Sequence, residues 1–243
     1  MNVSEKTKIE QFYPDIITYG GLTNAINENF NNLKSTLKTI DCDNEFNTFS
    51  WAIIKKNKRS SQVTIALNER LFIVSLWNEG INYGAWNFVD LKKVSQFIVH
   101  FVELKLSIKE IKKTFPWFES KSGELHEKGV KMEIKYSWNN LIKWLNEEKS
   151  LMKYLLPCVK ITKKIPQLRV LFPFTSMNTL CFSLTTGYPY KEIGPKITAW
   201  ENNCFEIKFC ENEIKKVYSL KDLKKHIRQE IGYYGIAEQG TVE

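Results

Sequence analysis

Arginine is scarce in this sequence, because its 35 basic residues include only Arg59, Arg70, Arg169 and Arg228. The net charge is +8 over 243 residues, and a basic balance by itself makes a polyanion partner a candidate. Planar phosphate and base recognition relies mainly on guanidinium forks, which lysine cannot form. The composition therefore disfavours a nucleic-acid partner. It predicts that the clusters at residues 55–59 and 224–228 are a solvated turn and a solvated helix face.

Paired cysteines and long apolar segments are also missing. The five cysteines are an odd, scattered set without a C-x-x-C pair, which excludes a disulfide-dense secreted scaffold. Residues 1–6 lack the apolar core of a signal peptide, and no run of about 20 apolar residues occurs. We therefore expect a cytoplasmic protein with reduced thiols and no membrane partner.

Motifs of the common catalytic and cofactor sites are absent. The sequence contains no G-x-x-x-x-G-K-[ST], no G-x-G-x-x-G and no G-x-S-x-G, which argues against a P-loop, a dinucleotide fingerprint and an α/β-hydrolase elbow. The three histidines lie far apart and outside H-E-x-x-H spacing. We therefore predict no metal and no cofactor.

Helix-like and strand-like patterns occupy separate stretches of the chain. Apolar residues recur at helical spacing from Leu22 to Ile40. Four strand-like runs with short connections follow, at 49–54, 63–67, 71–77 and 81–86. Asp90 and the Ser107–Glu110 capping box begin further helices. The segregation of helix-like from strand-like stretches predicts an α+β fold. Its expected order is an N-terminal helix, an antiparallel four-strand meander, central helices, C-terminal antiparallel strands and a final helix.

The amino-acid composition of the chain changes at Pro166, where its last third begins. Residues 170–190 carry no charge, and we interpret them as two buried strands, Arg169–Phe174 and Thr179–Thr185, around a turn. This divides the chain into a helix, meander and helical region at 1–165 and a region of β-hairpins plus a C-terminal helix at 166–243. The pattern is equally compatible with one core shared by both halves.

Polar groups at the ends of these strands are the candidate ligand-binding residues. Tyr188 and Tyr190 follow the second strand, and an arginine, hydroxyls and tyrosines beside apolar walls are what a small polar-ligand pocket requires. Arg70, between two strand runs, could equally be a turn charge or an anion clamp. The candidates are Arg70, Trp77, Arg169, Phe174, Thr175, Ser176 and Tyr188. The competing interpretation of the 169–176 segment is a turn capped by its own serine and threonine side chains.

His126 and Glu127 are the candidates for proton-transfer chemistry, because an imidazole beside carboxylates can titrate near neutral pH. The competing interpretation is a polar, exposed helical turn. Neither interpretation decides whether the protein is an enzyme.

Several stretches in the same order resemble an uncharacterised bacterial family commonly labelled "natural product biosynthesis protein". The resemblance extends from about Tyr13 to Ile231 and rests on Tyr13–Asp15, Gly20–Leu22, Glu69–Trp77, Gly80, Asp90–Val102, Phe115–Trp117, His126–Gly129, Arg169–Ser176, Leu180, Phe182, Tyr188 and Pro189. It implies a cytoplasmic, single-family protein associated with biosynthetic genes. It supplies no catalytic residues.

Three functions follow as hypotheses, and the third is a nucleic-acid-associated factor that uses the lysine clusters at 55–59 and 224–228. The first is a non-catalytic recognition or accessory protein, of the partner-binding or immunity type, because the nucleophile, metal and cofactor signatures are missing and aromatic residues that could anchor an interface are plentiful. Its partner would be another protein. The alternative is a small enzyme or ligand-binding protein of secondary metabolism with a pocket near Arg169–Ser176.

Overall fold

The computed structural model describes residues 3–40, 49–209 and 214–233 and has the α+β arrangement expected from the sequence. The chain forms two compact units, residues 1–127 (unit 1) and 128–243 (unit 2). The division follows Glu127, so the change of composition at Pro166 falls inside unit 2. The reason is that α8 (Val130–Glu147) and α9 (Leu155–Thr162) contribute to the same core as the strands that follow them.

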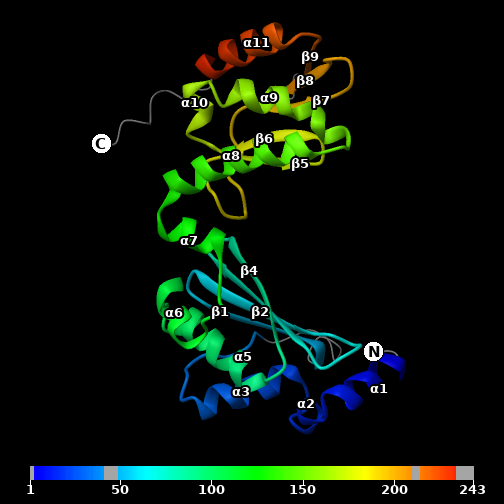
Figure 1. Cartoon of the computed structure of the whole chain (residues 1–243), viewed down its shortest axis with the longest axis vertical. Coiled ribbons are helices and arrows are strands. Elements are labelled where there is room, and N and C mark those ends of the chain that lie inside the picture. The colour runs from blue at the N-terminus through cyan, green and yellow to red at the C-terminus, as the bar shows by residue number, and fades with distance from the viewer. Residues whose placement is uncertain (1–2, 41–48, 210–213, 234–243) are drawn as a thin grey trace. The chain divides into compact units, whose positions relative to one another are not determined.

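Unit 1 is a four-stranded antiparallel meander with helices packed on one side (Figure 1). The strands pair in sequence order and are β1 (Trp51–Lys56), β2 (Arg59–Ile65), β3 (Phe72–Asn78) and β4 (Ile81–Phe88). The helices are α1 (Val3–Phe12), α2 (Pro14–Thr18), α3 (Leu22–Asn32), α5 (Leu91–Ile98), the π-helical turn η1 (Val99–Glu103), α6 (Ile108–Thr114) and α7 (Lys121–Glu127).

Alternation along the strands explains the core of unit 1. Phe72, Val74 and Leu76 in β3 are fully buried, whereas the residues between them are half-buried, as expected when one face of a sheet meets a helix layer. The predicted N-caps also form: Asp90 accepts a hydrogen bond from the backbone N–H of Lys92, and Ser107 forms a reciprocal capping box with Glu110.

The first long helix is shorter than its apolar pattern predicts. α3 ends at Asn32, and Lys34 adopts a positive φ of 55°, which stops the helix. Leu37 is nevertheless buried, and Thr39 forms a bridge with Ile54 in β1. The predicted helix from Leu22 to Ile40 is therefore wrong beyond Asn32. The apolar residues of the extended segment that follows happen to recur at helical spacing.

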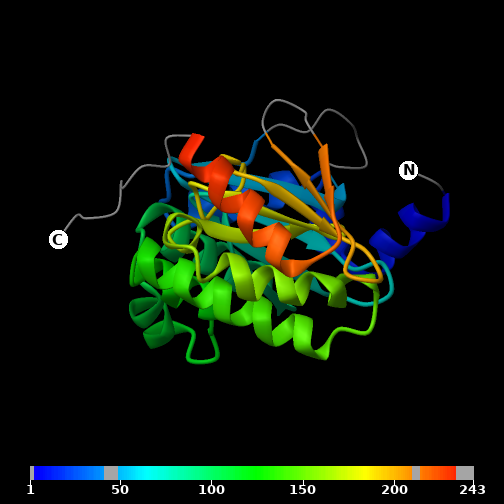
Figure 2. The same cartoon turned by 90° about the horizontal axis from the view of Figure 1, so that it is seen from above.

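Unit 2 combines a five-stranded antiparallel sheet with a layer of helices on one face. The strands again pair in sequence order and are β5 (Phe172–Ser176), β6 (Thr179–Ser183), β7 (Lys196–Ala199), β8 (Phe205–Lys208) and β9 (Ile214–Val217). The helices are α8, the short turn η2 (Leu151–Tyr154), α9, α10 (Pro166–Arg169) and α11 (Leu220–Tyr233). Figure 2 shows α8 and α9 running along one side of the yellow strands.

The core of unit 2 lies between these two layers. It contains Trp138 of α8, Val159 of α9 and Ile227 of α11, together with Phe182 and Ile207 of the sheet. Arg169 does not begin a strand, as the sequence suggests, but ends α10, because Pro166 at the first helical position favours a helical turn. Among the described residues, no helix is both long enough and apolar enough to cross a membrane.

Candidate functional site

An aromatic stack covers the face of the unit 2 sheet that is turned away from the helices. Pro173 is buried toward the core, so its neighbours Phe172 and Phe174 project from the opposite face. Tyr190 lies nearly parallel to both rings, with centroids 5.8 Å from Phe172 and 4.3 Å from Phe174. Burial raises the pKa of the Tyr190 phenol. The stack is thus a half-buried aromatic wall on the face without helices.

The loop at 184–191 carries the exposed part of this surface. Ser183 and Thr185 fix its base: the Ser183 hydroxyl accepts from the backbone N–H of Thr185, and the Thr185 hydroxyl accepts from the N–H of Lys191. A backbone hydrogen bond from Leu184 to Lys191 closes the loop. Tyr188 is 73% exposed and meets Tyr190 edge to face. The loop therefore presents Tyr188 from a hydrogen-bonded base.

The edge of the sheet beside this surface is closed. The outward carbonyl oxygen of Pro173 accepts a hydrogen bond from the Ser137 hydroxyl of α8 at 3.1 Å. The indole N–H of Trp138 donates to the carbonyl oxygens of Arg169 and Leu171. Pro173 itself has no N–H to offer. The outer edge of β5 therefore offers few free backbone N–H and C=O groups to which another strand could pair. Recognition at β5 must use side chains instead.

The hydroxyl candidates and Arg169 do not converge. Arg169 is exposed before β5, and Ser176 is exposed at its far end. The rise of a strand puts about 13 Å between the first and last Cα atoms of β5. Thr175 lies on the core side, and Cys181, which pairs with Phe174, is buried with its thiol pKa raised to about 11 by that burial. The structure therefore joins Phe174 to Tyr188 through Tyr190 but places Arg169 and Ser176 apart.

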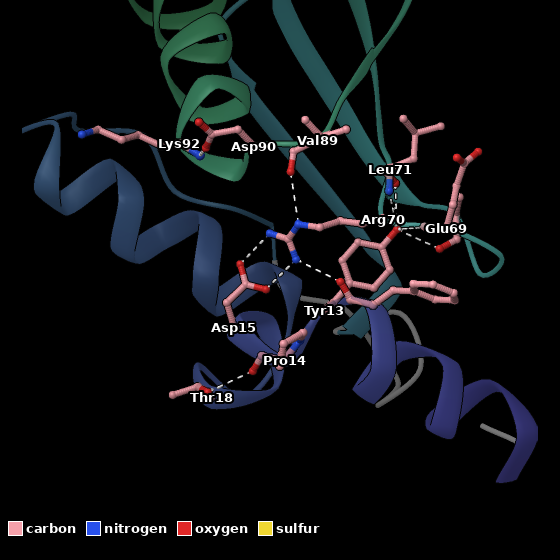
Figure 3. A network of polar contacts seen from close by, with 12 residues as sticks. Tyr13, Pro14, Asp15, Thr18, Glu69, Arg70, Leu71, Val89, Asp90 and Lys92 are labelled. Carbon is pink, nitrogen blue, oxygen red and sulfur yellow. Dashed lines mark hydrogen bonds and ion pairs between the residues drawn. The ribbon is translucent and has the colours of Figure 1, made fainter.

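The Arg70 side chain is held by hydrogen bonds and an ion pair within unit 1 (Figure 3). Its guanidinium forms a bidentate pair with Asp15 at 2.7 and 2.8 Å and donates to the carbonyl oxygens of Phe12 and Val89. The hydrogen bonds from Arg70 lower the pKa of Asp15, and Asp15 in turn raises the pKa of Arg70. An anion at Arg70 would have to compete with the Asp15 carboxylate.

Tyr13 completes this network. Its phenol oxygen accepts from the N–H of Leu71 at 2.8 Å and lies 2.8 Å from the carbonyl oxygen of Ala66, to which it donates. The ring is fully buried against Phe72. Tyr13, Asp15 and Arg70 thus fasten α2 to the β2–β3 connection, an arrangement that no local sequence pattern predicts.

Trp77 lies near the end of β3, on the face of the unit 1 sheet opposite its core, where it is half-buried. Both Arg70 and Trp77 belong to unit 1, whereas the other ligand-binding candidates belong to unit 2.

His126 and Glu127 point to different partners. The imidazole of His126 packs edge-on against Tyr83, and its Nε2 atom lies 3.8 Å from the Glu79 carboxylate. Glu79 also pairs with Lys58, which lowers the pKa of that carboxyl. Glu127 accepts a hydrogen bond from the backbone N–H of Ile108 at the start of α6. Glu79 is therefore a charged neighbour of His126, and Glu127 caps the start of α6.

Within the described residues, no three His, Cys, Asp or Glu side chains gather closely enough to hold a metal ion. Phe172 was not among the candidates, and Tyr190 was noted only as a tyrosine after the second strand; both belong to the aromatic wall. The alternation Phe172-Pro173-Phe174 is the one local signal for Phe172, because it puts both rings on one face. The position of Tyr190 depends on the fold of its loop.

Comparison with known proteins assigns part of unit 2 to a domain family. No curated protein and no solved structure matches the chain. Nothing in the comparisons carries the biosynthetic label of the resemblance noted above. Residues 133–222, from α8 to the first turn of α11, match a family of unknown function (DUF6193), and this segment includes the aromatic wall and the 184–191 loop.

Proposed function

We propose that this protein is a non-catalytic recognition protein that binds another protein through the 184–191 loop and the aromatic wall of unit 2. The exposed Tyr188 beside the Phe172–Tyr190–Phe174 stack is the observation that carries the proposal. Tyrosines that fill a pocket in a partner are typical energetic centres of protein interfaces. Leu184, 58% exposed on the same loop, adds apolar contact area.

The construction of the loop favours binding. Hydrogen bonds at Ser183, Thr185 and Lys191 hold the backbone before any partner arrives, so less conformational entropy is lost on association. The surrounding residues 170–219 contain five basic and five acidic residues. A neutral surface with aromatic anchors suits a protein partner better than a polyanion, and the closed edge of β5 excludes the simplest form of strand addition there.

Photocrosslinking tests this proposal. The full chain carries a photoreactive phenylalanine analogue in place of Tyr188, and a matched chain carries it at Trp117, an exposed aromatic of unit 1. We expect one discrete adduct from position 188 that excess wild-type protein suppresses and that position 117 does not give.

The crosslinked protein is then purified and titrated. Tyr188→Ala should weaken its binding at least tenfold, whereas Tyr188→Phe, which keeps the ring, should change it less than threefold. Unchanged affinity of Tyr188→Ala, or an adduct that wild-type protein does not suppress, would exclude this surface as the interface.

A further inference from the structure

The net charge of the protein is concentrated on the helices of unit 2. Unit 1 contains 16 basic and 15 acidic residues, and unit 2 contains 19 and 12. Within unit 2 the strand region 170–219 is balanced, whereas residues 130–169 and 220–233 hold 13 basic residues against five acidic ones. The excess positive charge thus lies on the helix layer of unit 2. The net charge of the whole chain does not show this location.

On α8 three exposed lysines form a stripe beside the buried face. Lys131, Lys135 and Lys143 are exposed and share, with Asn139, the four-residue spacing of one helix face. The buried residues of α8, among them Trp138 and Leu145, lie beside this stripe, because Trp138 is three residues from Lys135. The ammonium group of Lys163 donates to the side-chain oxygen of Asn139 at 2.6 Å, which adds a further cation beside the stripe.

α11 carries a second stripe of basic side chains, opposite its buried residues. Lys221, Lys225 and Arg228 are exposed at spacings of four and three, while Leu223 and Ile227 are fully buried. No ion pair involves these three basic side chains in the part of the chain that the structure describes.

The two stripes belong to one surface. α9 contacts both α8 and α11, so it lies between them, and its Lys160 is exposed. Neighbouring helix axes are about 8–10 Å apart, which separates the outer stripes by about 20 Å. The outer side of the helix layer is therefore a broad, cationic surface on the opposite side of the sheet from Tyr188.

We propose that this outer helix surface (Lys131, Lys135, Lys143, Lys160, Lys221, Lys225 and Arg228) binds the phosphate backbone of a nucleic-acid duplex without reading its sequence. Lysine point charges suit backbone contacts, whereas base reading would favour arginine forks. Two rows of cations about 20 Å apart, with Lys160 between them, match a wide polyanion better than one strand. The inference goes beyond the proposed function and uses a separate surface.

Alternative occupants fit this surface less well. Single-stranded nucleic acid is typically bound by several stacking aromatic side chains. Among the described residues of α8, α9 and α11, Trp144 is the one aromatic side chain that is exposed. Insertion into lipid needs a continuous apolar helix face that points outward. The exposed apolar residues of α8, Val130, Met132 and Trp144, do not share one face at helical spacing. The expectation from composition, that arginine scarcity disfavours nucleic acid, concerns base reading and leaves backbone binding open.

Fluorescence anisotropy of a labelled 20-base-pair duplex of mixed sequence tests the inference with the full-length protein. Binding at 25 mM NaCl should weaken steeply by 200 mM, because each neutralised phosphate releases counterions. The triple variant K221Q/K225Q/R228Q should bind at least tenfold more weakly and lower the slope of log affinity against log salt by about 2–3. A second unrelated duplex should bind within threefold of the first.

The matched control is K92Q/K93Q/K109Q, which removes the same charge from exposed positions of unit 1. It should keep the wild-type affinity and slope. Three outcomes would overturn the inference: no binding at 25 mM NaCl, equal loss in both triple variants, or equally tight binding of poly-L-glutamate or of vesicles containing 30% phosphatidylglycerol. Circular dichroism confirms that each variant is folded.

Discussion

Tyr190 lies over Phe174 with ring centroids 4.3 Å apart and an interplanar angle of 26°. Its phenol ring connects the edge strand β5 to the loop that presents Tyr188, so it has a structural role that its exposed neighbour does not share. We expect Tyr190→Ala to destabilise unit 2 by about 1–3 kcal/mol, because the variant loses buried aromatic area and the contacts with both phenylalanines. Urea denaturation followed by tyrosine and tryptophan fluorescence measures the change.

Tyr188→Ala is the control for this prediction. It removes a ring that is mostly in solvent and should shift the stability by less than about 0.5 kcal/mol. Equal destabilisation by the two variants would show that the loop, rather than the stack, supports the fold.

The Asp15–Arg70 pair should make the stability of unit 1 depend on pH in the acid range. The folded-state pKa of Asp15 is lowered, so its contribution is present above its ordinary pKa of 3.8 and is lost as the pH falls through the folded value. Asp15→Asn should therefore lower the stability at pH 7 by about 0.5–1 kcal/mol, because both side chains are partly exposed, and have a smaller effect at pH 2. A thermal melt at each pH measures both differences.

A double-mutant cycle with Arg70→Gln separates the pair from the other hydrogen bonds of the arginine. The Asp15–Arg70 coupling should be favourable at pH 7 and smaller at pH 2. A coupling that does not change with pH would contradict an ionic interaction.

Glu103 provides a second acid-sensitive contact in unit 1. Burial would raise its pKa, but hydrogen bonds from Ser35, Thr36 and Lys56 outweigh this and lower the pKa to about 2. The depressed value stabilises the fold above pH 4.5, and the contribution disappears as the pH falls toward 2. Glu103→Gln should lose about 1–3 kcal/mol at pH 7. Its stability should converge with that of the wild type near pH 2, as measured by urea titrations across this range.

The described cysteines should differ in reactivity. Cys158 and Cys181 are buried, and burial raises their thiol pKa values to about 12 and about 11, whereas Cys204 is partly exposed. Because the thiolate is the reactive form, iodoacetamide at pH 8 should modify Cys204 well before the other two. Peptide mass spectrometry at timed intervals measures each rate. Urea should make the three rates similar, and rapid modification of Cys181 in the native protein would contradict its burial.

Local patterns predicted much of the secondary structure. The N-caps at Asp90 and Ser107 were predictable because capping depends on residues within one turn, and the four-strand meander because its strands alternate and its turns are short. The end of α3 was not predictable from periodicity, since the burial of Leu37 results from packing of an extended segment.

The candidate site was predicted only in part. Phe174 and Tyr188 belong to one surface, but the ring that joins them, Tyr190, reaches β5 through a loop whose path is fixed by Ser183 and Thr185. Arg70 was identified without its partner, because Asp15 lies far away in sequence and meets it through the packing of α2. Such pairs depend on long-range geometry, which a single sequence does not encode in any local spacing.

The sequence by itself determined the α+β class, the helix caps and the excess of positive charge, because each depends on residue type or on neighbours within a few positions. Only the tertiary structure decided that this charge lies on the outer helices of unit 2, that Arg70 is held by Asp15, and that Tyr188 extends beside a stacked aromatic wall. The reason is physical: burial and pairing depend on which elements pack together, and that packing is decided by the whole chain.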